Sequence, residues 1–382
     1  MDGGIDELIE LTKDNEVILQ SILKTKSILE RYQNPCCSIS GGKDSDIMLD
    51  IIYKLDTKRK CSYVWFNTGI EYQATKDHID WLEEKYDIQI FRERAIKPIP
   101  LSCKQYGQPF LSKLASSHID LLQRNNFQWE DDTFENLCSK YPNCRSAISW
   151  WTNHNNGEKF NISYNNYLKE FLMDYPPDFQ ISDKCCTYAK KEVSHQFEST
   201  HNVDLRITGI RRAEGGVRAL AYTDCFTDNS GTGLMSAYRP LFWYTEKDEA
   251  DYDRIFGIKH SDCYEVYGFS RTGCVGCPFN KDFEEDAAIT AKYEPALAKA
   301  AGNIFKDSYE YTRKHNAYVA IRRERFSKVK AKAKEDFDRW YWRQGGYEQY
   351  HWNNKELKKQ RNDFIEQRLK EHHDEIYKRD RI

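Results

Sequence analysis

Short apolar runs alternate with segments of helical periodicity between residues 36 and 92. Residues 36–39, 61–67 and 88–92 are apolar or aromatic runs of strand length, and the segments 47–55 and 72–86 repeat apolar residues with a helical period. Strands and helices that alternate in this way predict a parallel sheet with helices on both faces. The pattern therefore predicts an α/β fold with a doubly wound, mostly parallel sheet, whose ligands bind beyond the carboxyl ends of the strands.

The turn that joins the first predicted strand to the first predicted helix is rich in glycine and polar residues. It consists of Ser40, Gly41, Gly42, Lys43, Asp44 and Ser45. Glycines let the backbone approach a phosphate and adopt positive φ, and the start of the next helix presents unpaired amides and the positive end of the helix dipole. The turn is predicted to bind an anion. Its spacing fits neither a Walker A loop nor the dinucleotide fingerprint.

This hexapeptide resembles the Ser-Gly-Gly-x-Asp-Ser loop of the PP-loop ATP pyrophosphatases, whose fold is of the adenine nucleotide α-hydrolase type. The resemblance implies binding of ATP and cleavage between its α and β phosphates, which yields AMP and pyrophosphate. It also implies that Lys43, Asp44 and Ser45 are catalytic: Lys43 and the loop amides stabilise charge on the pyrophosphate, and Asp44 orients Mg²⁺. An ordinary glycine turn is the alternative interpretation.

A second motif follows the strand predicted at 61–67 and consists of Asn67, Thr68, Gly69 and Glu71. It resembles the Asp-Thr-Gly segment that follows the second strand of the sulfonucleotide reductases, which implies contact with the nucleotide. Asn67 stands where those relatives have Asp. The change removes a charge, so a metal or proton role for this position does not carry over.

A third motif follows an apolar run at 205–210, where Gly209, Arg211, Arg212 and Arg218 are the candidate nucleotide-binding residues. Three arginines on a turn beyond a strand suit a phosphate or a sulfate, and a solvated basic surface is the alternative. The segment resembles the Thr-Gly-x-Arg-Arg motif of the phosphoadenosine phosphosulfate reductase family, although Gly215 replaces the usual Ser.

Twelve cysteines in a chain without a signal-peptide pattern favour a reducing, cytoplasmic location and metal binding over disulfides. The tandem Cys185-Cys186 and the Cys-x-x-Cys of Cys274 and Cys277 form a predicted four-thiolate site. The pattern resembles the adenylylsulfate reductases that bind a 4Fe-4S cluster next to the nucleotide; zinc is the alternative. Because adjacent side chains reach one cluster only through strained backbone, Cys263 is a rival for Cys185, and Cys225 is a weaker one. The remaining cysteines, Cys103 among them, are interpreted as small apolar fillers.

One feature of the resembled reductases is missing. They attack sulfur with a cysteine in a C-terminal Glu-Cys-Gly-Leu-His segment, whereas this chain has no cysteine after Cys277. The sequence therefore argues against sulfate reduction by a thiol of its own tail.

The predicted domains are N-terminal helices (1–30), a nucleotide-binding core with the cysteines (31–100 and 181–283), an aromatic insertion (101–180) and a helical C-terminal extension (284–382). The insertion either shapes the substrate pocket or packs its own core. Residues 313–382 hold 20 Lys and Arg against 12 Asp and Glu, a net charge of +8, whereas the rest of the chain has −11. Basic residues interleaved with aromatics suit nucleic acid, and a solvated helical hairpin or a dimer arm is the alternative.

Three functions are compatible with these motifs. The leading hypothesis is an enzyme that binds ATP and Mg²⁺, adenylates an oxygen of a nucleic acid (DNA or tRNA) or of a nucleotide and replaces it with sulfur, as in the thiolating relatives of this superfamily, with a possible sulfur-donor protein. The second is a sulfonucleotide reductase with an external thiol. The third is a non-catalytic nucleotide-binding module. No apolar run has the length of a membrane span, and a homodimer is compatible with the tail.

Overall fold

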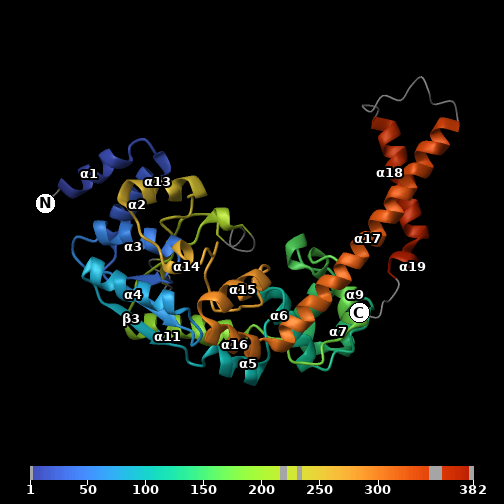
Figure 1. Ribbon diagram of the computed structural model, residues 1–382, viewed down its shortest axis with the longest axis horizontal. Coiled ribbons are helices and arrows are strands. Elements are labelled where there is room, and N and C mark those ends of the chain that lie inside the picture. The colour runs from blue at the N-terminus through green and yellow to red at the C-terminus, as the bar shows by residue number, and fades with distance from the viewer. Residues whose placement is uncertain (1–2, 216–221, 230–234, 344–354, 378–382) are drawn as a thin grey trace. The chain divides into compact units, whose positions relative to one another are not determined.

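The fold is that of an α/β core followed by a helical region (Figure 1). The structure is a computed structural model, and it describes residues 3–215, 222–229, 235–343 and 355–377. The described chain divides into two compact units. Unit 1 comprises Met1–Ser116 and Ile181–Lys306, and unit 2 comprises Ser117–Gln180 and Asp307–Ile382.

Unit 1 is built on a six-stranded sheet in the order β3-β2-β1-β4-β6-β5. All neighbouring strands are parallel except β5 and β6, which pair antiparallel at one edge. The predicted α/β class and mostly parallel sheet are thus confirmed. The strands are β1 (Pro35–Ile39), β2 (Ser62–Asn67), β3 (Ile90–Arg94), β4 (Leu205–Ile207), β5 (Phe226–Thr227) and β6 (Ser236–Tyr238).

Alternating side chains of the central strand enter two different cores. Cys37 of β1 packs with Ile47 and Ile51 in the larger core, whereas its neighbour Cys36 packs with Val64 of β2 and Phe197 in a smaller one. Because successive residues of a strand point to opposite faces, helices cover both sides of the sheet, as a doubly wound fold requires.

The first helices of unit 1 lie where the sequence predicts helices. Helices α1 and α2 lie in the predicted N-terminal helical region, and the periodic segments 47–55 and 72–86 lie in α3 and α4, between the first three strands. Their bounds and those of the later helices are α1 (Gly3–Thr12), α2 (Glu16–Arg31), α3 (Lys43–Leu55), α4 (Gln73–Tyr86), α5 (Ile99–Tyr106), α10 (Lys184–Cys186), α11 (Glu192–Thr200), α13 (Glu246–Phe256), α14 (Asp262–Glu265), α15 (Phe283–Tyr293) and α16 (Pro295–Ile304).

Unit 2 is helical in its described part and has an aromatic core. Trp150 and Trp151 are fully buried, and the indole N–H of Trp151 donates to the Glu130 carbonyl over 2.9 Å. These insertion aromatics therefore pack an interior of their own. The helices are α6 (Lys113–Arg124), which begins in unit 1, α7 (Phe134–Lys140), α8 (Arg145–Trp151), α9 (Leu168–Asp174), α17 (Lys306–Arg343), α18 (Lys355–Glu371) and α19 (His373–Ile376).

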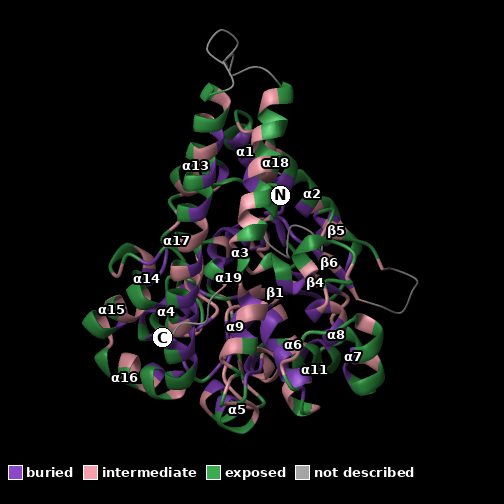
Figure 2. Cartoon of the chain, turned by 90° about the vertical axis from the view of Figure 1, so that its right-hand side faces the viewer, coloured by how far each residue is buried: buried purple, intermediate pink, exposed green. Residues whose placement is uncertain are grey.

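The long helix α17 joins the insertion to the C-terminal helices. Tyr318 of α17 donates to Asp174 at the end of α9 over 2.8 Å, and the buried Arg322 donates to the Ile376 carbonyl of α19. Farther along, Phe337 of α17 meets Phe364 of α18 with ring centroids 5.6 Å apart. The tail is thus a helical hairpin, and the views show much of α17 and α18 exposed (Figure 2). No described helix is both long and apolar enough to span a membrane.

Candidate active site

The glycine-rich loop lies at the carboxyl end of β1, where the sequence predicts an anion site. Gly42 is the N-cap of α3, and the Ser45 hydroxyl accepts from the amides of Gly42 and Ser40 at 3.1 and 3.3 Å. The same hydroxyl donates to the Gly42 carbonyl over 2.8 Å. Ser45 therefore holds the bend of the loop from within, and its hydroxyl occupies the Gly42 amide, one of the loop amides that sequence reasoning assigned to the anion.

Two close approaches explain the glycines. Gly41 has a φ of +70°, and a Cβ at this position would lie 2.9 Å from Cγ2 of Thr75. Gly209, just beyond β4, lies so near the loop that an added Cβ would be 3.1 Å from the Asp44 carbonyl oxygen. The first and third sequence motifs therefore meet at one edge of the sheet.

Asp44 belongs to a cluster of charges at this edge. Arg211 Nε lies 2.9 Å from Asp44 Oδ1 and 2.6 Å from Glu249 Oε1 of α13. Burial is the largest cause that raises the pKa of Glu249, and the neighbouring Asp44 raises it as well. Arg211 lowers this pKa by less, so that its value is about 9. Asp44 and Arg211 were predicted site residues, and Glu249 was not.

The other two predicted arginines behave differently. Arg212 is exposed, and its guanidinium carbon lies 5.4 Å from the ring centroid of Trp243. Arg218 lies outside the described residues. Arg211 is therefore the described arginine of this motif that contacts the glycine-rich loop.

The motif after β2 folds back on itself beside the loop. Thr68 donates through its hydroxyl to Glu71 over 2.6 Å and through its amide over 3.3 Å. Asn67 accepts from the Gly69 amide over 2.9 Å, and Gly69 has a φ of +86°. Glu71 is buried, and burial raises its pKa.

The segment before the Cys-x-x-Cys covers the glycine-rich loop. Tyr264 and Thr272 share a 2.7 Å hydrogen bond, and a Cβ on Gly42 would lie 3.2 Å from the Tyr264 hydroxyl and 3.7 Å from that of Thr272. The Lys43 ammonium lies 5.1 Å from the Tyr264 ring centroid. Two residues after Thr272, Cys274 lies near Thr68, whose side chain lowers the pKa of the thiol.

All four predicted metal-ligand cysteines lie in unit 1 and influence one another electrostatically. Cys185 raises the pKa of Cys186, and the charges of Cys274, Cys277 and Cys186 influence one another. A π-helical turn over Thr187–Lys191 follows the tandem pair directly. Such turns are frequent at functional sites, although Cys186 itself has ordinary helical backbone, with φ −68° and ψ −34°.

Two residues that sequence reasoning missed complete this group. The Cys103 thiol of α5 forms a hydrogen bond with Cys185, so the interpretation of Cys103 as an apolar filler overlooked a neighbour of the site. Lys190 is an exposed residue of the π-helical turn. The negative charge of Cys274 is the main cause of its raised pKa, and the charge of Glu71 contributes less. The rival Cys263 contacts Thr75 at 3.6 Å and Ser261 instead.

Among the described residues, no group of three or more His, Cys, Asp or Glu side chains surrounds a single point as one metal ion requires. The donor chemistry nevertheless suits a thiolate-bound centre, because the four thiols influence one another electrostatically and three of them also raise the pKa of Lys190. Burial is the first cause of the raised pKa of Cys274 and of the rise to about 12 for Cys277. Metal binding to these thiols would therefore release protons.

A buried ionic chain supports α3 from behind the loop. His260 Nδ1 lies 2.9 Å from Asp46 Oδ2 and its Nε2 lies 3.1 Å from Asp253 Oδ2, while His78 Nε2 lies 3.1 Å from Asp46 Oδ2. Burial lowers the pKa of His260, but the hydrogen bonds with Asp253 and Asp46 outweigh it and raise the pKa to about 9. His260 is therefore a cation at neutral pH.

We expect His260→Gln to destabilise unit 1 by about 3 kcal/mol, because it leaves the buried Asp46 carboxylate without its cation. Since the pKa is raised on folding, the stabilisation is complete below the unfolded value of about 6.5 and is lost as pH rises through the folded value. Urea unfolding at pH 6 and pH 10 should show a smaller pH effect in the variant than in the wild type. The exposed His195→Gln of α11 is the control, and equal pH effects in all three proteins would contradict the prediction.

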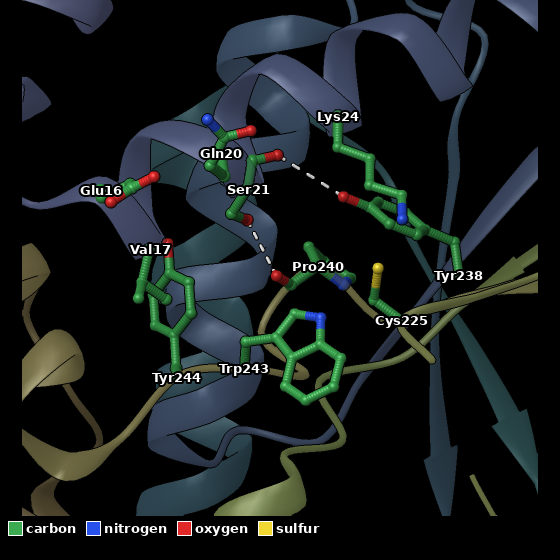
Figure 3. A pocket seen from close by; sticks show the side chains of 10 residues that line it. All are labelled: Glu16, Val17, Gln20, Ser21, Lys24, Cys225, Tyr238, Pro240, Trp243 and Tyr244. Carbon is green, nitrogen blue, oxygen red and sulfur yellow. Dashed lines mark hydrogen bonds between the residues drawn. The ribbon is translucent and has the colours of Figure 1, made fainter. Parts of the chain in front are cut away.

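A separate cavity of about 390 Å³ lies between α2 and the segment around Pro240 (Figure 3). Ser21 of α2 donates to the Pro240 carbonyl over 2.8 Å, and Lys24, Cys225 and Trp243 line the walls. Apart from Cys225, the weaker rival for a metal ligand, none of the residues predicted for the nucleotide or the metal lines it. Burial raises the pKa of Cys225, which does not favour it as a nucleophile.

Comparison with known proteins agrees with the first two motifs. The family model of the phosphoadenosine phosphosulfate reductase domain matches residues 34–109, which include the glycine-rich loop and the Asn67 motif. Residues 34–109 are therefore similar to the phosphoadenosine phosphosulfate reductase domain. The predicted resemblance to PP-loop and phosphoadenosine phosphosulfate reductase-like proteins is thereby confirmed. No curated protein sequence matches the chain.

Two solved structures show distant likeness. Phosphoadenylyl-sulfate reductase from Candida auris, in its phosphate complex, is 12% identical over 65% of this chain and 87% of its own, with a TM-score of 0.35. The U34-tRNA thiolase NcsA from Methanococcus maripaludis, with its [4Fe-4S] cluster, is 15% identical over 77% of this chain and 79% of its own, with a TM-score of 0.32. At these scores neither likeness bears on the chemistry of the site.

Proposed function

We propose that the chain is a PP-loop ATP pyrophosphatase that adenylates an acceptor oxygen and replaces it with sulfur. One observation carries the proposal: the segment that ends in the Cys-x-x-Cys lies on the glycine-rich loop. A Cβ added to Gly42 would lie 3.7 Å from the Thr272 hydroxyl oxygen. Cys274 lies near Thr68, which follows the end of β2. A nucleotide on the loop and a thiolate centre would therefore be neighbours.

The loop residues have distinct roles in this reaction. The acceptor oxygen attacks the α phosphorus of ATP, the bond to the β phosphate breaks, and pyrophosphate leaves with both electrons. Lys43, at the start of α3, and the helix dipole stabilise the charge on the leaving group. Asp44 is partly exposed at the same helix end and orients Mg²⁺ directly or through water, while Ser45 keeps the bend in shape. A sulfide-level donor then displaces AMP from the acceptor.

The cysteines would hold an iron-sulfur cluster next to this site. Cys185, Cys186, Cys274 and Cys277 are the proposed ligands, and Lys190 compensates their negative charge. A cluster takes one thiolate on each of its irons, whereas zinc needs four sulfurs at about 2.3 Å from one point. When bound, the cluster would supply or position the transferred sulfur.

The acceptor class follows from the surface of α17. Exposed basic residues and exposed tryptophans lie together in the C-terminal half of α17. Cations bind the phosphates of a nucleic acid, and aromatic rings stack on its bases. Trp340 and Trp342 have exposed fractions of 49% and 38%. The exposed basic residues are Arg323, Lys328, Lys330, Lys332, Lys334 and Arg339.

The test is a product analysis with the full, anaerobically purified chain. It is incubated with ATP and Mg²⁺, with and without tRNA or DNA, and AMP and pyrophosphate are measured by chromatography. We expect both products in equal amounts, and more of them when the nucleic acid is present. Sulfite formed from a sulfonucleotide and a thiol donor would instead support a reductase. Binding of ATP without any turnover would leave a nucleotide-binding module.

A further inference from the structure

Glu249 is a partly buried acid that none of the sequence motifs contains. It lies in the first turn of α13, a helix that packs against α3, and its side chain has an exposed fraction of 13%. Its closest ionic contact is Arg211 Nε at 2.6 Å, and Asp44 raises its pKa. Glu249 therefore connects α13 to both the glycine-rich loop and the arginine motif.

The contacts of Arg211 explain what such an acid can do. The closest approach of the guanidinium to each carboxylate runs through Nε, at 2.9 Å from Asp44 and 2.6 Å from Glu249. A guanidinium has five donors in a rigid planar fork, so a group that holds its Nε edge fixes the plane and leaves the two terminal amino groups for an oxyanion. Without such a holder, a long arginine side chain would lose rotational freedom on binding, which costs free energy.

We propose that Glu249 is a positioning residue that holds Arg211 by its Nε edge and aims its terminal amino groups at a tetrahedral oxyanion, the departing pyrophosphate, on the glycine-rich loop. This inference rests on the proposed function, because it requires a polyphosphate on that loop. It assigns the recognition of the leaving group to three elements: the start of α3, the turn after β4 and the first turn of α13.

A role of Glu249 through its negative charge and a role in positioning Arg211 predict opposite effects on anion binding when Glu249 is removed. If Glu249 acted through its negative charge, its removal would lessen repulsion and tighten the binding of an anion. If it positions Arg211, its removal weakens binding although an acid has been lost. Gln retains both an acceptor for Nε and a donor for Asp44, so Glu249→Gln is the conservative variant and Glu249→Ala is the disruptive one.

The experiment is calorimetric titration of the full chain with inorganic pyrophosphate and with ATP, both with Mg²⁺. We expect Glu249→Ala to weaken pyrophosphate binding about tenfold, the scale of one charge-assisted contact, and Glu249→Gln to stay within about twofold of the wild type. In an Arg211→Lys background, which lacks the Nε edge, Glu249→Ala should have no further effect. The matched control is Glu246→Ala, an exposed acid in the same helical turn.

The outcomes separate this inference from the proposed function. Unchanged or tighter pyrophosphate binding in Glu249→Ala, or an equal loss in the Arg211→Lys background, would overturn the positioning role while ATP binding by the wild type stands. A wild-type protein that binds neither ATP nor pyrophosphate would remove the proposed function itself. Thermal unfolding of each variant establishes that the comparison is made between folded proteins.

Discussion

Replacing Asp44 with Ala should abolish the release of AMP and pyrophosphate from ATP, with a loss of at least about 100-fold in kcat. Asp44 lies in the first turn of α3 and keeps an exposed fraction of 29%. Without its carboxylate, the start of α3 loses the group that would orient Mg²⁺, and Arg211 loses one of its two anchors. Folding should be little affected, because the Asp44 side chain is not part of the hydrophobic core.

The measurement is a steady-state assay of pyrophosphate release together with thermal unfolding. Asp80→Ala is the control, since Asp80 is an exposed acid that pairs with Arg92 on the surface. Turnover retained by a folded Asp44→Ala protein would count against the assignment of the active site to this loop.

The second large effect is expected at the cysteines. Cys186→Ser and Cys274→Ser should lose nearly all bound iron, because each thiolate holds one iron of a cluster and a serine hydroxyl is a poorer, less acidic ligand. The anaerobically purified wild type should show a broad absorption shoulder at roughly 400 nm, typical of thiolate-bound iron, and the variants should not. Cys138→Ser, a cysteine of unit 2, is the control.

The same series resolves the identity of the ligands. Cys185→Ser should lose iron as Cys186→Ser does, whereas Cys263→Ser should retain it, because Cys263 contacts Thr75 and Ser261. Cys103→Ser measures whether the neighbour of Cys185 is a ligand or only a hydrogen-bond partner. A stoichiometric zinc content with no visible absorption in the wild type would contradict the iron-sulfur assignment.

Local patterns in the sequence were sufficient to predict the parallel sheet and the glycine-rich loop. The glycine-rich hexapeptide occurs between an apolar run and a periodic segment, and both the strand and the helix form as their patterns predict. Such features depend on residues close together in the chain, where spacing carries the information.

Residues that come from distant segments were not predictable in the same way. Glu249 looks like any acid in the first turn of a helix, and Cys103 looks like a small apolar residue. Their proximity to Arg211 and Cys185 results from the packing of α13 and α5 on the core, which no local pattern reports. Likewise, the Ser45 hydroxyl takes up two loop amides through contacts that only coordinates reveal.

The central claim is that the phosphates of an adenine nucleotide bind at the start of α3. The most direct test of this claim is a calorimetric titration of the metal-loaded wild type and of Lys43→Ala with ATP and Mg²⁺. We expect saturable binding of one ATP per chain in the wild type and loss of this binding in the variant. No heat of binding from the intact wild type, or equal affinity in both proteins, would contradict it.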